Sequence, residues 1–236
     1  VLHEPFRQWA VEDNFVGDMR PDFAAVGVEL VDDVTQFEHM KLRMLNGSHS
    51  ALAYLGYLAG HETISDTMAD PAFATYARQL WAEIMPAVRA PNGLDLQDYA
   101  DALADRYANP MIRHRTWQIA MDGSQKLPQR LLGTLEAKLA TQNPAPALCL
   151  AVAAWMYYVG GVDEAGQPIE VQDPLALKLR AISDAAGTPA DKVAGLLALS
   201  EIFPPELARK LKAPVTEAAQ LLWTRGARQA TLQVVS

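Results

Sequence analysis

Polar side chains of five different chemistries gather in one short segment that otherwise has the pattern of a buried helix. They are Glu38, Lys41, Asn46, Ser48 and His49. With Lys41 as the origin, a helical rotation of about 100° per residue puts Glu38 at about 60° and His49 at about 80°. Ser48 then lies at about −20° and Asn46 at about 140°. A carboxylate, an amine, an amide, a hydroxyl and an imidazole therefore share one broad helix face.

These groups suit the oxidation of a secondary alcohol. A lysine whose pKa is lowered by burial from about 10.4 is a general base near neutral pH. An amide and an imidazole one turn apart can donate hydrogen bonds to one substrate oxygen. Together they would take the proton of the alcohol while a hydride leaves to a cofactor. Because the helix continues into the apolar residues 51–55, we expect the polar face to line a cleft.

Structural explanations exist for the same residues. Thr35 and Glu38 have the spacing of a capping box, in which both side chains only close the first turn of a helix. A single lysine or histidine on a helix is structural in most proteins. The polar face would also suit a non-catalytic helical module that uses it as an interaction or oligomerisation interface. The residues by themselves leave these alternatives open.

Other common catalytic motifs are missing from the sequence. None of the 14 glycines stand two apart, so there is no Gly-x-Gly dinucleotide fingerprint. The five histidines form no His-Glu-x-x-His pair, and the single cysteine, Cys149, has no thiolate partner for zinc. There is no Gly-x-Ser-x-Gly nucleophile elbow. We expect no metal site and no nucleotide-binding domain within these residues.

Helix start signals outnumber strand patterns along the chain. Two Asp-Pro steps and one Thr-Pro step each combine an N-cap residue with a proline at the first helical position. The expected helices are 71–85, 94–107, 128–138, 174–187, 189–203 and two more that open at Pro205 and Pro214. Strand patterns are confined to 25–31 and 169–171. We therefore predict a mainly α-helical chain of about ten helices in one domain, 1–236.

The composition is that of a globular protein with an acidic surface. Of the 236 residues 50% are hydrophobic, and 20 basic side chains stand against 28 acidic ones, a net charge of −8. No basic stripe is available to bind nucleic acid or an acidic membrane. The apolar run 147–159 is too short to span a bilayer. A lone cysteine favours a reducing compartment, so we expect a cytoplasmic protein.

The spacing of Lys41, Asn46 and His49 resembles the signature of the polyol-specific long-chain dehydrogenase/reductase family, which includes mannitol dehydrogenases and fructuronate reductases. Five segments resemble blocks of that family, in the family's order. They are 4–14, 31–33, 46–54, 118–126 and 161–164. The resemblance extends over nearly the whole chain.

The resemblance implies roles for individual residues. Lys41 would be the catalytic general base, and Asn46 and His49 would hold and polarise the reacting oxygen. Glu38 would match an acid that helps the proton to reach solvent. Lys126 would match a lysine that contacts substrate hydroxyls.

The resemblance leaves two substrate pairs open, mannitol with fructose and mannonate with fructuronate. Mannitol dehydrogenases of the family often have an arginine eight residues before the substrate lysine, where this chain has Gln118. The run 113–130 is closer to fructuronate reductases. The carboxylate of a sugar acid would need a cation, although each arginine here would equally suit the surface or helix pairing. The candidates are Arg113, Arg115, Lys126 and Arg130.

By the same resemblance, the chain is a multi-helix C-terminal substrate domain with a fold like the C-terminal domain of 6-phosphogluconate dehydrogenase. The family's N-terminal Rossmann domain, which binds NAD or NADP, would lie outside it. The chain begins at Val1 without a methionine or a signal-peptide pattern, so we expect a piece of a longer polypeptide. Its expected partners are a small polyol or sugar acid and that Rossmann domain. We expect the isolated chain to be inactive and to self-associate through exposed apolar surface.

Overall fold

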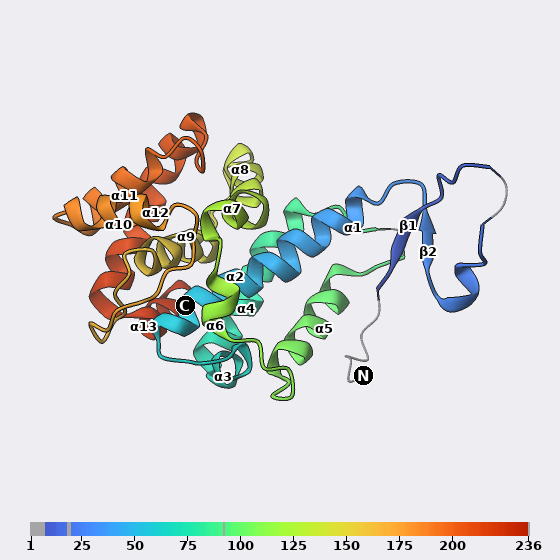
Figure 1. Ribbon diagram of the computed structural model, residues 1–236, viewed down its shortest axis with the longest axis horizontal. Helices are drawn as coiled ribbons and strands as arrows, with labels where there is room; N and C mark the ends of the chain where they lie inside the picture. Colours follow the sequence, from blue (N-terminus) through green and yellow to red (C-terminus); the bar gives the residue numbers. More distant parts are fainter. Residues whose placement is uncertain (1–7, 18–19, 92, 236) are drawn as a thin grey trace.

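The computed structural model describes residues 8–17, 20–91 and 93–235, so part of the expected 4–14 block lies outside the described residues. The strands are β1 (Ala10–Glu12) and β2 (Glu29–Val31), and the α-helices are α1 (Thr35–Met40), α2 (Ser48–Leu58), α3 (Ile64–Ala69), α4 (Pro71–Ile84), α5 (Leu96–Ala108), α6 (Thr116–Ala120), α7 (Gly123–Leu127), α8 (Gly133–Ala140), α9 (Pro146–Tyr158), α10 (Ala176–Ala185), α11 (Pro189–Leu197), α12 (Pro205–Arg225) and α13 (Ala227–Val234). Two π-helical turns (Lys41–Gly47 and Pro128–Leu132) and two 3-10 turns (Ala24–Val26 and Met85–Ala87) complete them. The prediction of a mainly α-helical chain with little strand is confirmed. Figure 1 shows a helical body from which the two strands project as an arm.

The helix α9 is the centre of the body. Every side chain from Ala147 to Met156 is buried, and the helix packs against α2 and α12. Its N-terminus is capped from α4, where the Glu83 carboxylate accepts hydrogen bonds from the N–H groups of Ala147 (3.0 Å) and Leu148 (2.9 Å). A carboxylate there satisfies orphan donors and complements the helix dipole. No described helix is both long and apolar enough to cross a membrane.

Local capping signals place two helices as predicted. The helix α4 begins one residue after Asp70, whose carboxylate accepts a hydrogen bond from the Ala72 N–H at 3.0 Å. The helix α11 begins one residue after Thr188, whose hydroxyl accepts one from the Asp191 N–H at 3.2 Å. In both cases a proline at the first helical position follows the cap and fixes the backbone for the helix.

Two prolines that were expected to open helices lie inside continuous helical runs instead. Pro214 falls within α12, whose side chains Leu211 and Val215 are fully buried on either side of it. Their burial offsets the one backbone hydrogen bond that a proline removes. Pro128 stands at the start of the π-helical turn that joins α7 to α8.

The strand predictions are correct only in part. Within 25–31 the strand is limited to β2, which pairs in parallel with β1. Gly27 has a φ of 82°, a left-handed conformation that ends a 3-10 turn and interrupts the extended chain. The segment 169–171, which the structure describes in full, contains no strand.

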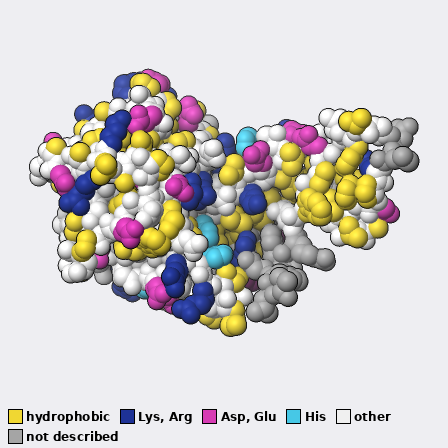
Figure 2. All heavy atoms as spheres, in the orientation of Figure 1, with side chains coloured by type: hydrophobic (Ala, Val, Ile, Leu, Met, Phe, Trp, Pro, Cys, Tyr) yellow, Lys and Arg dark blue, Asp and Glu magenta, His cyan; other side chains and the backbone are white. Residues whose placement is uncertain are grey.

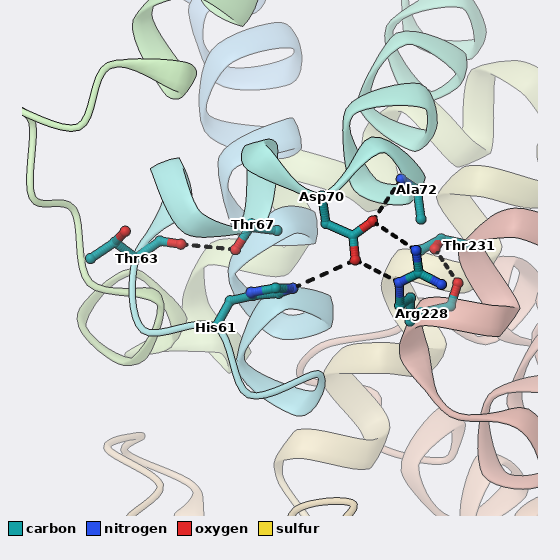
Figure 3. Close-up of polar contacts among 7 residues, drawn as sticks. All are labelled: His61, Thr63, Thr67, Asp70, Ala72, Arg228 and Thr231. Atoms are coloured by element: carbon teal, nitrogen blue, oxygen red, sulfur yellow. Dashed lines mark hydrogen bonds and ion pairs between the residues drawn. The ribbon is translucent and has the colours of Figure 1, made fainter.

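Acidic side chains from distant segments tie the C-terminal helix α13 to the body. Arg228 donates to the Asp70 carboxylate from Nε at 2.6 Å and from Nη2 at 3.3 Å (Figure 3). The Glu164 carboxylate accepts a hydrogen bond from the Ala227 N–H at 2.6 Å, in the first turn of α13. These contacts hold α13 on the body at a distance from the arm (Figure 1).

Candidate active site

A cleft of about 820 Å³ lies where the helical body meets the arm. The arm contributes apolar side chains that include Trp9, the π-helical turn contributes Lys41 and Asn46, and α5 contributes a further wall with Tyr99 and Arg106. Figure 2 shows Lys, Arg and His side chains gathered along the hollow between the body and the arm. The cleft therefore combines one apolar side with one polar side.

The segment Lys41–Gly47 is π-helical, which corrects the regular α-helical geometry used above. Hydrogen bonds in a π-helix join residues five apart, so residues with that spacing lie one above the other. Lys41 and Asn46 have this spacing, whereas a regular α-helix would separate them by about 140°. The wider turn thus brings both side chains to the same face, and both line the cleft.

Side chains from α4 and α5 stabilise the π-helical turn. The carbonyl oxygen of Met44 accepts a hydrogen bond from Trp81 Nε1 at 3.1 Å, and that of Leu45 accepts one from Tyr107 Oη at 2.6 Å. Gly47 lies against the second π-helical turn, and a Cβ there would stand 2.7 Å from the Arg130 carbonyl oxygen. Since the irregular turn uses these partners, it depends on tertiary contacts.

Lys41 and Glu38 are both exposed, whereas a buried lysine was assumed from the sequence. The role of Lys41 as a general base stays a prediction. The two side chains also line a second hollow of about 490 Å³ beside the cleft. The capping box expected for Glu38 does not form, because Thr35 lies inside α1 and its N–H donates to the Asp33 carboxylate at 2.8 Å. Glu38 is thus not occupied by helix capping.

His49 lies deeper than Lys41 and Asn46. Its ring stacks on Tyr107 with centroids 5.0 Å apart, and the His114 ring lies 5.1 Å away. Burial lowers the pKa of His49 to about 3, and the nearby charges of His114, Arg106 and Arg130 act in the same direction. His49 Nε2 is buried without a hydrogen-bond partner among the described residues. The imidazole is therefore neutral at pH 7.

The other residues nominated from the sequence lie outside the lining of this cleft. Arg113 and Gln118 are exposed, and the exposed Arg115 stands 3.9 Å from Glu62. Lys126 Nζ donates to the Met121 carbonyl oxygen at 2.6 Å. Their substrate contacts stay predictions.

Arg130 is half-buried near His49 and donates from Nη1 to Ser50 Oγ at 2.8 Å. Burial lowers the pKa of its guanidinium from the ordinary value. The Arg130 side chain is thus committed to α2, and its backbone packs against Gly47.

Sequence reasoning missed two residues of α5 that line the cleft, Tyr99 and Arg106. The helix expected at 94–107 is confirmed, but neither residue was nominated for the site. Tyr99 and Arg106 are seven residues apart, so they lie on one helix face two turns from each other. That spacing was the available signal. Among the described residues, no three His, Cys, Asp or Glu side chains are placed to hold a metal ion.

Comparison with known proteins gives a consistent result. The family model of the mannitol dehydrogenase C-terminal domain matches residues 33–223. The chain is 52% identical over 232 residues to D-mannonate oxidoreductase of Escherichia coli K12, covering 97% of this chain and 47% of that protein. It is 39% identical over 211 residues to mannitol 2-dehydrogenase of Aspergillus fumigatus, covering 88% of this chain and 41% of that protein.

A solved structure agrees with these sequence matches. The chain superimposes on Pseudomonas fluorescens mannitol 2-dehydrogenase, solved with NAD and D-mannitol, with a TM-score of 0.88 and 35% identity. The match covers 98% of this chain and 46% of that one. The chain spans about half the length of these relatives. It belongs to the mannitol dehydrogenase family and carries that family's C-terminal domain.

Proposed function

We propose that this chain is the substrate-side half of an NAD-dependent oxidoreductase that interconverts a secondary alcohol and a 2-ketose of a six-carbon polyol or sugar acid. The observation that carries the proposal is the π-helical turn, which aligns Lys41 with Asn46 on the wall of one cleft. The family supports a dehydrogenase of polyols or sugar acids. The relatives that are twice as long support a second half that completes the enzyme.

Each residue has a role that its chemistry allows. Lys41 Nζ, as the neutral amine, takes the proton from the substrate hydroxyl. The Asn46 amide donates a hydrogen bond to the same oxygen as charge develops on it. His49, which is neutral, donates or accepts through the Nε2 that has no partner in the described chain. Glu38, beside Lys41 on the second hollow, passes the proton on to solvent.

The cleft suits the reacting end of a nicotinamide cofactor. Its apolar arm side, with Trp9 and Val28, faces a side with Lys41 and Asn46, which is the pairing a flat ring and a reacting hydroxyl need. When bound, NAD would be the acceptor of the hydride. The chain has no Gly-x-Gly cradle for a diphosphate, so we assign that part of the cofactor to the other half of the enzyme.

The exposure of Lys41 has a functional consequence under this proposal. A general base acts best in a site from which bulk water is excluded. Trp9 and Val26, which flank the cleft, are 60% and 68% exposed. We infer that the second half of the enzyme covers these apolar side chains and excludes water from Lys41. The covered cleft then favours proton transfer between Lys41 and the substrate hydroxyl over exchange with bulk water.

A second candidate function is an interaction module, because exposed apolar side chains beside the cleft also suit a protein interface.

Replacement of Lys41 separates the two functions in the full-length protein. Lys41→Ala should lower turnover of D-mannitol or D-mannonate by about 10²- to 10⁴-fold, the contribution typical of a general base, with an unchanged unfolding midpoint. Lys210→Ala, an exposed lysine of α12 that lies 3.6 Å from Glu206, is the matched control. Retained turnover with lost association would support the interface instead.

A further inference from the structure

We propose that Arg130 is a positioning residue for His49, which it holds from both sides through its backbone and its side chain. This inference rests on the proposed function, because it needs His49 to act on the reacting oxygen. The second π-helical turn, Pro128–Leu132, carries Arg130 and packs against the first one, Lys41–Gly47. Arg130 then supports the site and does not bind the substrate.

Two contacts of Arg130 flank His49 along the chain. On the N-terminal side, the Arg130 carbonyl oxygen lies against Gly47, where a Cβ would stand only 2.7 Å from it. On the C-terminal side, Arg130 Nη1 donates a hydrogen bond to Ser50 Oγ at 2.8 Å. Both Gly47 and Ser50 are buried, and His49 lies between them. Close packing on both sides therefore leaves the segment that carries the imidazole little freedom to rotate.

Tyr107 holds the same imidazole from α5. Its ring stacks on that of His49 at an interplanar angle of 14°, and its hydroxyl donates to the Leu45 carbonyl oxygen at 2.6 Å. Tyr107 and Tyr54 also lie near the Arg130 guanidinium, where they oppose the fall in its pKa that burial causes. His49 is thus held by Tyr107 across the face of its ring and by Arg130 along the chain.

The charge of Arg130 gives it a second effect on His49. Burial lowers the pKa of His49 to about 3, and the charges of His114, Arg106 and Arg130 act in the same direction. Burial raises the pKa of Tyr107, the titratable group stacked on the ring, so Tyr107 adds no charge there. A guanidinium keeps its charge in proteins. Arg130 therefore disfavours the imidazolium and helps to keep His49 in its neutral form.

The Arg130 side chain is poorly placed to bind a substrate directly. Arg130 is not among the described residues that line the cleft, whereas Lys41 and Asn46 are. Its guanidinium is half-buried and donates to Ser50, a buried residue of α2. These observations favour a role in which Arg130 acts through His49.

Kinetics of the full-length enzyme separate positioning from substrate binding. With each of D-mannitol and D-mannonate that the parent turns over, Arg130→Met should lower kcat by about 10-fold and change KM by less than about threefold. Arg130→Lys keeps the charge and a donor, so its kcat should stay within about threefold of the parent's. Arg209→Met, which removes an exposed arginine of α12 that lies 2.7 Å from Glu206, should leave both constants unchanged. An unchanged kcat in Arg130→Met, or a rise in KM confined to D-mannonate, would overturn the positioning role.

The titration of His49 is a readout that a purely structural role would not move. NMR of the full-length enzyme with isotope-labelled histidine follows the His49 ring, whose signal is identified by its loss in His49→Gln. Arg130→Met should raise the pKa of His49 above that of the parent, because it removes a positive neighbour. Ser50→Ala removes the hydrogen-bond acceptor but no charge, so it should lower kcat and leave the pKa of His49 close to the parent's. An unchanged pKa in Arg130→Met, or an equal rise in Ser50→Ala, would overturn the proposal.

This titration needs no turnover, so it separates the inference from the proposed function. If Lys41→Ala kept the parent's turnover while Arg130→Met still raised the pKa of His49, the proposed function would fail and the action of Arg130 on His49 would stand. If Lys41→Ala lost turnover while Arg130→Met changed neither kcat nor the pKa of His49, the proposed function would stand and the positioning role would fail.

Discussion

The continuous helical run from Thr35 to Leu58 changes character at Gly47. Its C-terminal part, α2, is a regular α-helix whose residues from Ala51 to Leu55 are buried in the core. Its middle part is a π-helical turn whose Lys41 and Asn46 line a cleft. In α2 the side chains hold the helix in place by packing. In the π-helical turn, side chains from other helices hold the backbone, which leaves its own polar side chains available.

This difference shows how the fold separates stability from chemistry. Burial of α2 against α9 fixes the position of the run, and a site built on such a rigid element keeps its geometry. A π-helical turn is rare and is frequent at functional sites, because it re-aims side chains at a cost in regular hydrogen bonding. Here Trp81 and Tyr107 offset that cost by bonding to the carbonyl oxygens of Met44 and Leu45.

The largest expected effect on stability comes from adding a side chain at Gly47, where the π-helical turn packs against the Arg130 backbone. Gly47→Ala would place a Cβ 2.7 Å from the Arg130 carbonyl oxygen, a backbone atom that cannot rotate away. We expect a loss of about 3 kcal/mol in the free energy of unfolding, measured by urea denaturation. Gly133→Ala is the control, because the nearest atom to its Cβ is 3.7 Å away, and it should be neutral or slightly stabilising. Equal effects of the two substitutions would contradict the close packing.

A somewhat smaller effect should follow from removing the tyrosine hydroxyl that supports the turn. Tyr107→Phe leaves the Leu45 carbonyl oxygen without its 2.6 Å donor and should cost about 2 kcal/mol of stability. Tyr76→Phe removes a similar buried bond, 2.8 Å to the Ala147 carbonyl oxygen, at the start of α9. Both should lower the unfolding free energy, but only Tyr107→Phe should reduce turnover as well. An equal loss of turnover in both variants would show that turnover does not depend specifically on the support of the π-helical turn.

The titration of His49 gives a smaller, pH-dependent effect. Its pKa is about 3 in the folded chain and about 6.5 when unfolded, so between these values only the unfolded chain binds the proton. Stability from this group is thus present above about pH 6.5 and is lost as the pH falls toward about 3, by roughly 1 kcal/mol per pH unit. The free energy of unfolding of the parent should fall more steeply over this window than that of His49→Gln. Parallel curves would contradict a buried neutral imidazole.

The smallest effect is expected far from the cleft, at the ion pair between Arg228 and Asp70 (Figure 3). The Arg228 side chain is 51% exposed, whereas that of Asp70 is 13% exposed, so water screens the pair from the arginine side and its contribution is small. Arg228→Gln should lower the unfolding midpoint by no more than about 2 °C and leave turnover unchanged. A large loss of turnover would mean that the C-terminal helix influences the cleft, which would contradict the separation of the two regions.

The parts that sequence predicts well are those set by local chemistry. Asp70 and Thr188 cap their helices as expected, since an N-cap and a following proline act within a few residues. The π-helical turn was not predictable in this way, because its acceptors Met44 and Leu45 depend on Trp81 and Tyr107 from distant helices. From the sequence, Lys41 and Asn46 were placed on one broad face by α-helical geometry. They do share a face, but the π-helical turn is the cause.

The cleft wall formed by α5 could not be predicted from local sequence patterns either, because it also depends on distant segments. Tyr99 belongs to the apolar face of an amphipathic helix, and only the approach of the arm and the π-helical turn makes it part of a cleft with Arg106. Conversely, the arginines nominated from the run 113–130 are exposed or committed to other partners. Sequence spacing along one helix does not show which segments face it across a cleft.

Chemical rescue of the Lys41→Ala enzyme tests whether Lys41 is the general base. In the full-length Lys41→Ala enzyme, small primary amines should restore turnover in proportion to the concentration of their free base, and more basic amines should restore more. The Asn46→Ala enzyme should not respond, because it lacks a donor rather than a base. A Lys41→Ala enzyme that keeps the parent's turnover, or responds to amines no more than Asn46→Ala does, would contradict the assignment of Lys41 as the general base.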